Sequence, residues 1–360
     1  MKIIHCADLH LDSKMESNLA SGDARLRRDE LLDTFGRMVT YAAENAVRAI
    51  IIAGDLFDKQ HIRKTARMRV LEEIELHPLI DFIYLKGNHD YSDFLDGVET
   101  MPENLKLFSD SEWTSYTYDD VVITGREITE DNVKTISTNL ILDSAMCNIV
   151  VLHGQESEYE GKDKTPVVTL PDFRDKYIDY MALGHIHYYK LDKLDDRGVW
   201  CYSGTLEGRG FDECGAKGFV LLNIEDKRVI PTFVPFAKRL LHEVEVELGS
   251  EDQDMPAIMG RISSAVEGIP EKDLVKVVLT GRIPMNTDID LPRIRRSFDE
   301  NFFFFKVQDR TRTLINYESF ANDRSLKGAF VRLVRDKDIP EKEKEKIIEI
   351  GMKALMGEEL

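Results

Sequence analysis

Short, continuous apolar runs recur through the first half of the chain, and each of them ends at a polar residue. The clearest run is Ile50-Ile51-Ile52-Ala53, which is followed by Gly54 and Asp55. An apolar run without alternation is typical of a strand buried on both faces, and a glycine lets the backbone leave that strand sharply. The pattern therefore predicts an α/β sheet whose strands deliver polar side chains at their carboxyl ends, where such sheets bind their ligands.

Four further runs end in the same way. They are residues 2–7, 82–86, 148–152 and 180–183, which lead to Asp8-x-His10, Asn88-His89, His153 and His185-x-His187. A single histidine after a strand is more often a hydrogen-bonded loop residue than a metal ligand. Five such ends taken together favour a shared metal site instead. Side chains two residues apart in extended backbone share a face, so both members of each pair can reach that site.

These strand ends supply oxygen and imidazole ligands and no thiolate. The candidate ligands are Asp8, His10, Asp55, Asn88, His153, His185 and His187. Such a set suits a divalent first-row ion such as manganese, iron or zinc. Seven ligands are too many for one catalytic ion, but they fit two ions about 3.5–4 Å apart that share a carboxylate. That arrangement is typical of phosphoester hydrolysis.

Apolar spacing predicts helices at residues 27–45, 63–76 and 132–144, and a strand pair at residues 113–125 with Asp119-Asp120 as its turn. From about Arg239 the pattern changes to a β-α-β-α-β order over residues 240–307. This order predicts a small α+β module with its own core and no candidate metal ligand. The chain thus divides into residues 1–238, 239–312 and a charged helical segment at 313–360.

Charge and composition limit the possible functions. The chain has 360 residues and a net charge of −18, which argues against a protein that coats DNA unaided. The clearest basic cluster is Arg293, Arg295 and Arg296 on one predicted helix, which either contacts DNA or forms a solvated face. No apolar run approaches the roughly 18 residues of a membrane span, no signal peptide is evident, and the four cysteines form no C-x-x-C pair. We therefore expect a cytoplasmic protein without a membrane partner.

Five motifs carry a family resemblance. They are Asp8-x-His10, Gly54-Asp55-x-x-Asp58, Gly87-Asn88-His89-Asp90, His153-Gly154 and Gly184-His185-x-His187. In order and spacing they resemble the signature blocks of calcineurin-like metallophosphoesterases and, within that superfamily, the SbcD-type nucleases of DNA double-strand break repair. The resemblance implies an α/β fold, namely a four-layer α/β/β/α sandwich at residues 1–238 with a smaller α+β capping domain at 239–312.

The resemblance also implies a role for each residue of these motifs. One ion is held by Asp8, His10, Asp55 and His187, and the other by Asp55, Asn88, His153 and His185. His89 stabilises the transition state or protonates the leaving oxygen, and Asp90 orients it. Asp58 stands where some relatives have a histidine and is expected behind a ligand. Arg209 either touches a phosphate or lies on the surface.

The function implied by the resemblance is a DNA nuclease with two divalent ions, Mn²⁺ first and Fe²⁺ or Zn²⁺ as alternatives. It would degrade duplex ends as an exonuclease, with endonuclease activity as a second mode, in DNA repair and recombination. Its partners would be DNA, an SMC-like ATPase of the SbcC type bound through residues 313–360, and a second copy in a homodimer. The helices at 27–45 and 63–76 are expected by default to cover the sheet, and as an alternative Phe35 and Met38 could contribute to the homodimer. The alternative is a small-molecule or nucleotide phosphodiesterase on the same fold.

Overall fold

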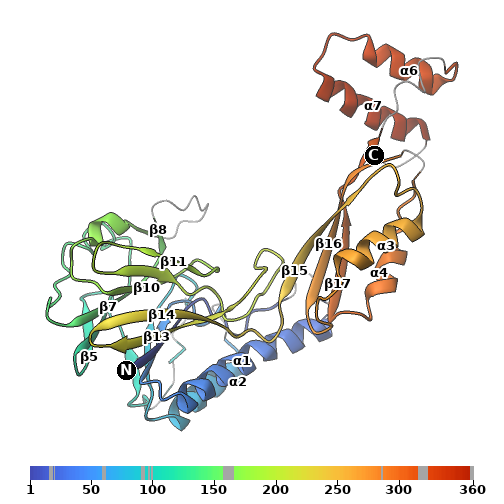
Figure 1. Ribbon diagram of the computed structural model, residues 1–360. Helices are drawn as coiled ribbons and strands as arrows, with labels where there is room; N and C mark the ends of the chain where they lie inside the picture. Colours follow the sequence, from blue (N-terminus) through green and yellow to red (C-terminus); the bar gives the residue numbers. More distant parts are fainter. Residues whose placement is uncertain are drawn as a thin grey trace. The chain divides into compact units, whose positions relative to one another are not determined.

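The computed structural model describes residues 1–15, 19, 21–58, 62–90, 94–95, 98, 100–156, 166–284, 287–314 and 323–356. The chain forms two compact units, Met1–Leu241 and His242–Leu360, which are described separately (Figure 1). The predicted C-terminal segment 313–360 lies partly outside the described residues. None of the described helices combines the length and apolar character needed to span a bilayer.

The first unit is built on two six-stranded sheets. The first has the order β14-β13-β1-β2-β3-β4, with β1 Lys2–Cys6, β2 Ala49–Ala53, β3 Asp81–Leu85, β4 Leu105–Leu107, β13 Gly218–Glu225 and β14 Arg228–Pro235. The second has the order β11-β12-β10-β7-β6-β5, with β5 Thr114–Tyr118, β6 Val121–Gly125, β7 Cys147–His153, β10 Tyr180–Gly184, β11 Lys190–Lys193 and β12 Val199–Tyr202. Strands β1, β2 and β3 run parallel, as do β7 and β10, so the predicted ligands follow the carboxyl ends of parallel strands.

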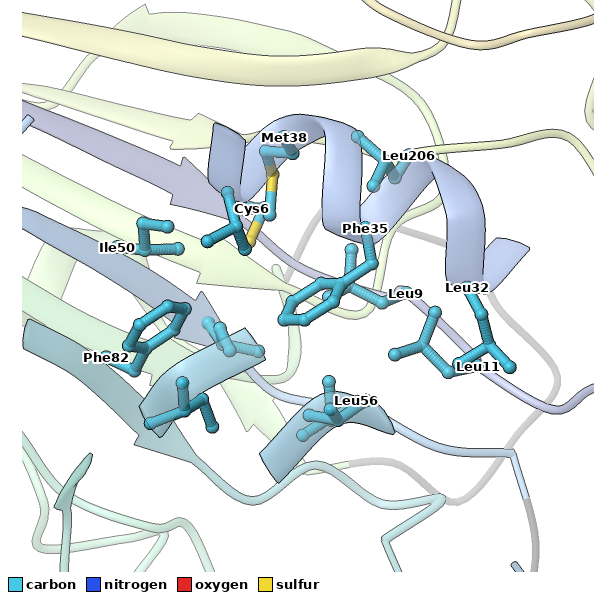
Figure 2. Close-up of a cluster of buried hydrophobic side chains, with 14 of the residues drawn as sticks. Cys6, Leu9, Leu11, Leu32, Phe35, Met38, Ile50, Leu56, Phe82 and Leu206 are labelled. Atoms are coloured by element: carbon cyan, nitrogen blue, oxygen red, sulfur yellow. The ribbon is translucent and has the colours of Figure 1, made fainter. Parts of the chain in front are cut away.

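Each of the central strands is buried on both faces, which explains the continuous apolar runs. Ile50 and Ile52 of β2 pack on α1 (Ser21–Glu44) and α2 (Lys64–Leu76), whereas Ile51 faces the second sheet. Figure 2 shows Phe35 and Met38 of α1 in the helix-covered core with Cys6, Ile50 and Phe82. The two helices lie alongside each other and were correctly predicted (Figure 1). The strand pair at 113–125 is also confirmed, as β5 and β6.

Phe35 and Met38 are therefore not available for a dimer. Both are at most 1% exposed, because they point into the core of their own chain. The default expectation that both helices cover the sheet is confirmed, and the alternative that Phe35 and Met38 contribute to a homodimer surface is wrong. An amphipathic pattern shows which side chains are buried, but it does not distinguish the chain's own core from a partner.

The predicted helix at 132–144 is also wrong. Residues 130–139 form turns, and the outer face of the second sheet is covered by these turns and by the short 3₁₀ helix η1 (Leu170–Phe173). The side chain of Asn132 donates to the carbonyls of Asp110 and Glu127 and accepts from the amide of Thr129. Such local bonds compete with helical ones, which explains why apolar spacing misled here.

The second unit contains a small sheet with the order β15-β16-β17, to which β18 is added beside β16. Its elements are β15 Leu241–Leu248, α3 Met255–Ala265, β16 Leu274–Pro284, α4 Leu291–Phe298, β17 Phe304–Asp309 and β18 Arg312–Leu314, so the predicted β-α-β-α-β order is confirmed. Asp254 and Asp290 cap α3 and α4 by accepting from Ala257 N and Arg293 N. Ile258, Ile294 and their neighbours pack on the sheet.

A helical hairpin ends the described chain. Helix α6 (Leu326–Arg335) packs on α7 (Glu341–Met356) through Val331, Val334, Ile348 and Met352. Other apolar side chains of the hairpin face outward, and these are Leu326, Leu333, Ile347, Ile350 and Leu355. The hairpin therefore has apolar surface beyond that used in its own small core.

A buried ion network ties α1 to the segments around Glu207 and Arg239. Arg27 donates to Glu30 Oε2 (2.7 Å) and to Glu207 Oε2 (3.3 Å), and Arg239 donates to Glu30 Oε1 (2.9 Å). Burial alone would raise the pKa of Glu30, but the hydrogen bonds from Arg239 and Arg27 lower it to about 2. The network therefore contains an ionised carboxylate at neutral pH.

Replacing Glu30 by Gln is expected to lower the free energy of unfolding at pH 7 by about 3 kcal/mol, because the partly buried Arg239 loses its carboxylate partner and the buried Arg27 keeps only Glu207. The carboxylate stabilises the fold fully above its unfolded pKa of 4.5, and this contribution is lost as the pH falls towards the folded pKa of about 2. Urea unfolding of both proteins in EDTA, at pH 7 and pH 3, measures the effect. The difference should shrink to about two fifths at pH 3; an equal difference at both pH values would contradict the assignment.

Candidate metal centre

The loops that carry the predicted ligands have unusual backbone angles. Asp8, His10, Asp55 and His185 have φ values of 52°, 42°, 52° and 107°, although none of them is glycine. Such conformations cost about 1 kcal/mol or more each and persist where the surroundings impose them, which is common at functional sites. Main-chain bonds from Asp8 N to Gly54 O and from His10 N to Asp55 O tie the loops after β1 and β2 together.

The structure brings all seven predicted ligands together. Three groups of donor atoms converge, and within each group the atoms lie within 4.8 Å of one another: Asp8 with His10 and His187, Asp8 with Asp55 and His153, and His10 with Asp58 and His89. Asn88 joins them, since its Oδ1 lies 2.8 Å from His153 Nε2 and 3.2 Å from His185 Nδ1. His185 is also tied to Asp8, because its amide donates to both carboxylate oxygens at 2.9 and 3.0 Å.

The hydrogen bonds made by Nδ1 of His153 and of His187 show that the other ring nitrogen, Nε2, faces the site. His153 Nδ1 donates to the carbonyl of Ala53 (2.9 Å), and His187 Nδ1 donates to Glu213 Oε1 (2.7 Å). The lone pair of each ring is therefore on Nε2. His187 Nε2 lies 3.2 Å from His10 Nε2. Two ligands of one first-row ion, each about 2.1 Å from it at roughly right angles, are about 3 Å apart.

Asp55 has the position expected of a bridging ligand. Its Oδ1 accepts from His89 N (2.8 Å), whereas its buried Oδ2 has no hydrogen-bond partner among the described residues. That oxygen lies 3.5 Å from His153 Nε2 and 3.8 Å from His10 Nε2, between the two groups of donors. Burial alone would raise the pKa of Asp55, but the two imidazoles hold it below its usual value. An ionised, partnerless oxygen at this point fits a pair of divalent cations.

Two glycines allow the rings to pack this closely. Gly54 has φ 92°, and a Cβ there would lie 2.1 Å from His153 Nδ1. A Cβ on Gly184 would lie 1.8 Å from the Ala53 carbonyl oxygen, the acceptor of the His153 proton. The glycines that mark the strand ends in the sequence are thus required by close contact around His153.

Comparison with known proteins agrees with this geometry. Residues 1–189 match the family model described as "Calcineurin-like phosphoesterase". The chain belongs to this family. It is therefore a metal-dependent phosphoesterase with a mixed α/β fold, and the residues above fit two divalent ions. When bound, such ions polarise the phosphoester and lower the pKa of a water molecule, which supplies the nucleophile.

Among relatives, the "Uncharacterized metallophosphoesterase YhaO" of Bacillus subtilis (strain 168) is 27% identical over 306 residues, which are 79% of this chain and 72% of that protein. Two solved structures are similar to the phosphoesterase at low identity. The protein TT1561 of Thermus thermophilus has a TM-score of 0.41 at 12% identity and covers 64% of this chain and 98% of its own. A dimetal phosphatase from Danio rerio has a TM-score of 0.41 at 11% identity and covers 65% and 99%.

His89 lies beside the phosphoesterase site, where its ring converges with His10 and Asp58, neither of which belongs to the group of Asp8, Asp55 and His153. Its ring is 5.1 Å from that of His10, and its side chain is 43% exposed. It is thus placed to meet a substrate that approaches from solvent. The acidic group nearest to the ring is Asp58, whose Oδ1 lies 3.6 Å from His89 Nδ1.

Asp90 does not orient His89 directly, which corrects the role expected for it. Its carboxylate accepts from the amides of Phe57 (3.1 Å) and Gly87 (2.9 Å) and makes no described bond to the His89 ring. It therefore holds the loop that carries Asn88 and His89. Burial, reinforced by the charge of Asp55, raises the pKa of Asp90 to about 6.

Three further residues stand behind the ligands, and sequence reasoning missed one of them. Asp58 Oδ1 lies 3.2 Å from His10 Nδ1, as expected of a residue behind a ligand. Glu213, which was not predicted, occupies the same position behind His187. Arg209 lies between the two carboxylates and is largely buried, so it is not a surface arginine. No spacing rule marks Glu213, because it lies in a turn 26 residues after the histidine that it holds.

The predicted basic cluster belongs to the second unit. Arg293, Arg295 and Arg296 are exposed on α4. Arg295 faces Asp299 at 3.7 Å, and within the described part of the chain Arg293 and Arg296 form no ion pair.

Proposed function

We propose that this phosphoesterase is a DNA nuclease that hydrolyses phosphodiester bonds of duplex ends, with endonuclease activity as a second mode, in DNA repair and recombination. The observation that carries the proposal is the second compact unit, His242–Leu360, which has its own core and adds no candidate metal ligand among its described residues. A phosphodiesterase of small molecules needs only the strand-end site. A polymeric substrate extends beyond the metal centre, so a second unit with exposed arginines could contact it.

The charge state of α4 supports this assignment. Arg293 and Arg296 are exposed without a described counter-ion, and the Arg295–Asp299 pair is more than 40% exposed on both sides, so it contributes little. Three guanidinium groups on two turns of one helix suit successive phosphates of a nucleic acid backbone. In a chain of net charge −18 a local cluster of this kind matters, because the overall field repels DNA.

The remaining parts of the proposal follow the resemblance to SbcD-type nucleases. Residues 1–238 would cleave, residues 239–312 would select DNA, and residues 313–360 would dock on an SMC-like ATPase. The outward apolar side chains of α6 and α7, such as Leu333 and Ile350, suit contact with a partner helix. Mn²⁺ is the proposed physiological ion, since the donor set mixes carboxylate, amide and imidazole. A homodimer and a cytoplasmic location complete the proposal.

Replacing Arg293, Arg295 and Arg296 together by Ala is expected to reduce cleavage of labelled duplex DNA several-fold, while hydrolysis of a chromogenic phosphodiester stays unchanged. If the arginines bind phosphates, the slope of log affinity against log salt should become shallower by about 0.9 per lost contact. Cleavage assays and DNA binding over a salt series, both with Mn²⁺, measure the two effects.

The matched control replaces Lys2, Lys227 and Arg228 by Ala, which removes the same charge. These residues lie at the amino end of β1 and at the neighbouring β13–β14 turn, the sheet edge opposite to the ligands. The control should keep the wild-type salt slope. Wild-type protein that hydrolyses the chromogenic ester with Mn²⁺ but leaves duplex DNA intact would overturn the nuclease proposal and favour the small-molecule or nucleotide phosphodiesterase.

A further inference from the structure

The two ligand imidazoles that face each other are held from behind by side chains. His10 Nε2 and His187 Nε2 lie 3.2 Å apart at the centre of the site. On the far side of each ring a carboxylate faces Nδ1, namely Asp58 at 3.2 Å from His10 and Glu213 at 2.7 Å from His187. Glu213 accepts a hydrogen bond from His187 Nδ1, which keeps the ring proton there and leaves Nε2 free to bind a cation. Asp58 faces His10 Nδ1 as an ion-pair contact without hydrogen-bond geometry.

A single arginine connects these two carboxylates. Arg209 Nη2 and Nε donate to Glu213 Oε1 at 2.9 and 3.2 Å, and its Nη1 lies 3.5 Å from Asp58 Oδ1. The amide of Arg209 also donates to Glu213 Oε2 at 2.9 Å, so both oxygens of that carboxylate are engaged. Ser13 Oγ donates to Asp58 Oδ2 at 2.9 Å, which holds the second carboxylate in place. We call Asp58, Arg209 and Glu213 the carboxylate–arginine bridge.

The other half of the site is held differently. His153 Nδ1 donates to the main-chain carbonyl of Ala53, the last residue of β2. A main-chain acceptor in a central strand cannot swing away, whereas side-chain acceptors stay in place only if their own partners hold them. The orientation of His10 and His187 therefore depends on neighbouring side chains, whereas the orientation of His153 depends on the main chain.

We propose that the carboxylate–arginine bridge is a positioning device for one of the two metal ions, the ion held by Asp8, His10 and His187. Arg209 acts through Asp58 and Glu213 and keeps both imidazoles in the tautomer and direction that bind the ion. The ion beside Asn88 and His153 does not depend on the bridge. The inference rests on the metal centre and not on the nature of the substrate. It can therefore be wrong while the nuclease proposal is right, and it can be right while the nuclease proposal is wrong.

The contacts of Arg209 argue against a direct role in binding phosphate. Its guanidinium is shared between two carboxylates, and 19% of its side chain is exposed. Turning towards a phosphate would leave Glu213, which is 5% exposed, without its cationic partner. Removing one member of such a pair leaves the other charge uncompensated, which is costly.

Metal binding of full-length variants tests the proposal without reference to activity. After equilibrium dialysis against Mn²⁺, wild-type protein should contain two ions per chain. Glu213→Gln, Asp58→Asn and Arg209→Ala should each bind one of the two ions about 10–100-fold more weakly and the other with unchanged affinity. The Mn²⁺ resonance spectrum should change from that of a coupled pair to that of a single ion at intermediate Mn²⁺ concentrations.

Two comparisons separate positioning from other roles. Arg209→Ala added to the Asp58→Asn/Glu213→Gln double variant should cause much less loss of affinity than Arg209→Ala alone, because the arginine acts mainly through these carboxylates, although its Nη2 also lies 3.2 Å from His187 Nδ1. Arg197→Ala is the matched control, since Arg197 also pairs with a carboxylate, Asp179, away from the ligands, and it should bind both ions normally.

Three results would overturn the proposal. The first is wild-type affinity for both ions in every bridge variant, and the second is an equal loss of both ions. The third is normal metal binding in Arg209→Ala together with a raised KM, which would make the arginine a phosphate-binding group. If Arg209→Ala does not fold, as judged by circular dichroism, Glu213→Gln decides, because it removes the charge without changing side-chain volume.

Discussion

Replacing Asp55 by Asn is expected to abolish phosphodiester hydrolysis and to lower the number of divalent ions bound per chain. The carboxylate is 1% exposed, and its Oδ2 lies between the two groups of donors without a hydrogen bond of its own among the described residues. The amide keeps the shape but removes the negative charge that two cations share. Several kcal/mol of transition-state stabilisation depend on that pair, so turnover should fall about 10³-fold or more.

Asp81 provides the matched control for this variant. It is also a buried aspartate of the first sheet, but it begins β3 and bonds Tyr118 at the edge opposite to the ligands. Asp81→Asn should keep both ions and most of the activity. Metal analysis and hydrolysis of a chromogenic phosphodiester measure both variants. Full activity in Asp55→Asn would refute its assignment as the bridging ligand.

His89→Ala is expected to separate metal binding from chemistry. The ring lies beside the ligands and is 43% exposed, in the position of a group that meets the substrate. Both ions and the affinity for substrate should remain, while turnover falls about 10²–10⁴-fold, the usual contribution of a positioned acid or base. Metal analysis and single-turnover kinetics distinguish the two properties.

The control for this variant is His77→Ala, because His77 ends α2 and donates locally to Glu73 O, away from the ligands. It should lower neither turnover nor metal content. Loss of metal in His89→Ala would mean that His89 is itself a ligand and that the site is built differently from the description above.

The metal ligands could be predicted from the sequence because they are polar residues at the ends of buried strands, where packing of the core requires no polar side chain. Strand β2 is apolar without interruption, since both of its faces are covered, and Asp55 directly after it has no structural reason to be buried. Strands β7 and β10 are parallel neighbours in the second sheet, so the same argument places His153 and His185 together at one edge of that sheet. Local pattern and strand direction were sufficient for this part of the site.

The bridge behind the ligands could not be predicted in this way. Asp58 and Arg209 are 151 residues apart, and their contact depends on how the loop after β2 meets the turn that contains Glu213. Such contacts arise from tertiary packing and leave no periodic trace. For the same reason the sequence suggested that Asp90 orients His89, although its carboxylate binds main-chain amides.

Apolar periodicity had a related limit. It correctly located α1, but it did not show that Phe35 and Met38 are buried within their own chain and not at a dimer surface. It also predicted a helix at 132–144, where local side-chain bonds of Asn132 favour turns. In both cases the apolar spacing is real, but it does not identify the interaction that forms. For Phe35 and Met38 this is packing within the chain's own core, and at 132–144 it is the set of side-chain bonds of Asn132.

The most direct test of a two-ion phosphodiesterase site is a Mn²⁺ titration of metal-free wild-type protein. The number of ions bound per chain and the rate of phosphodiester hydrolysis are measured in the same samples. We expect two ions per chain at saturation, with activity that rises as the second ion binds. Full activity with one ion per chain, or in the presence of a chelator, would contradict the account.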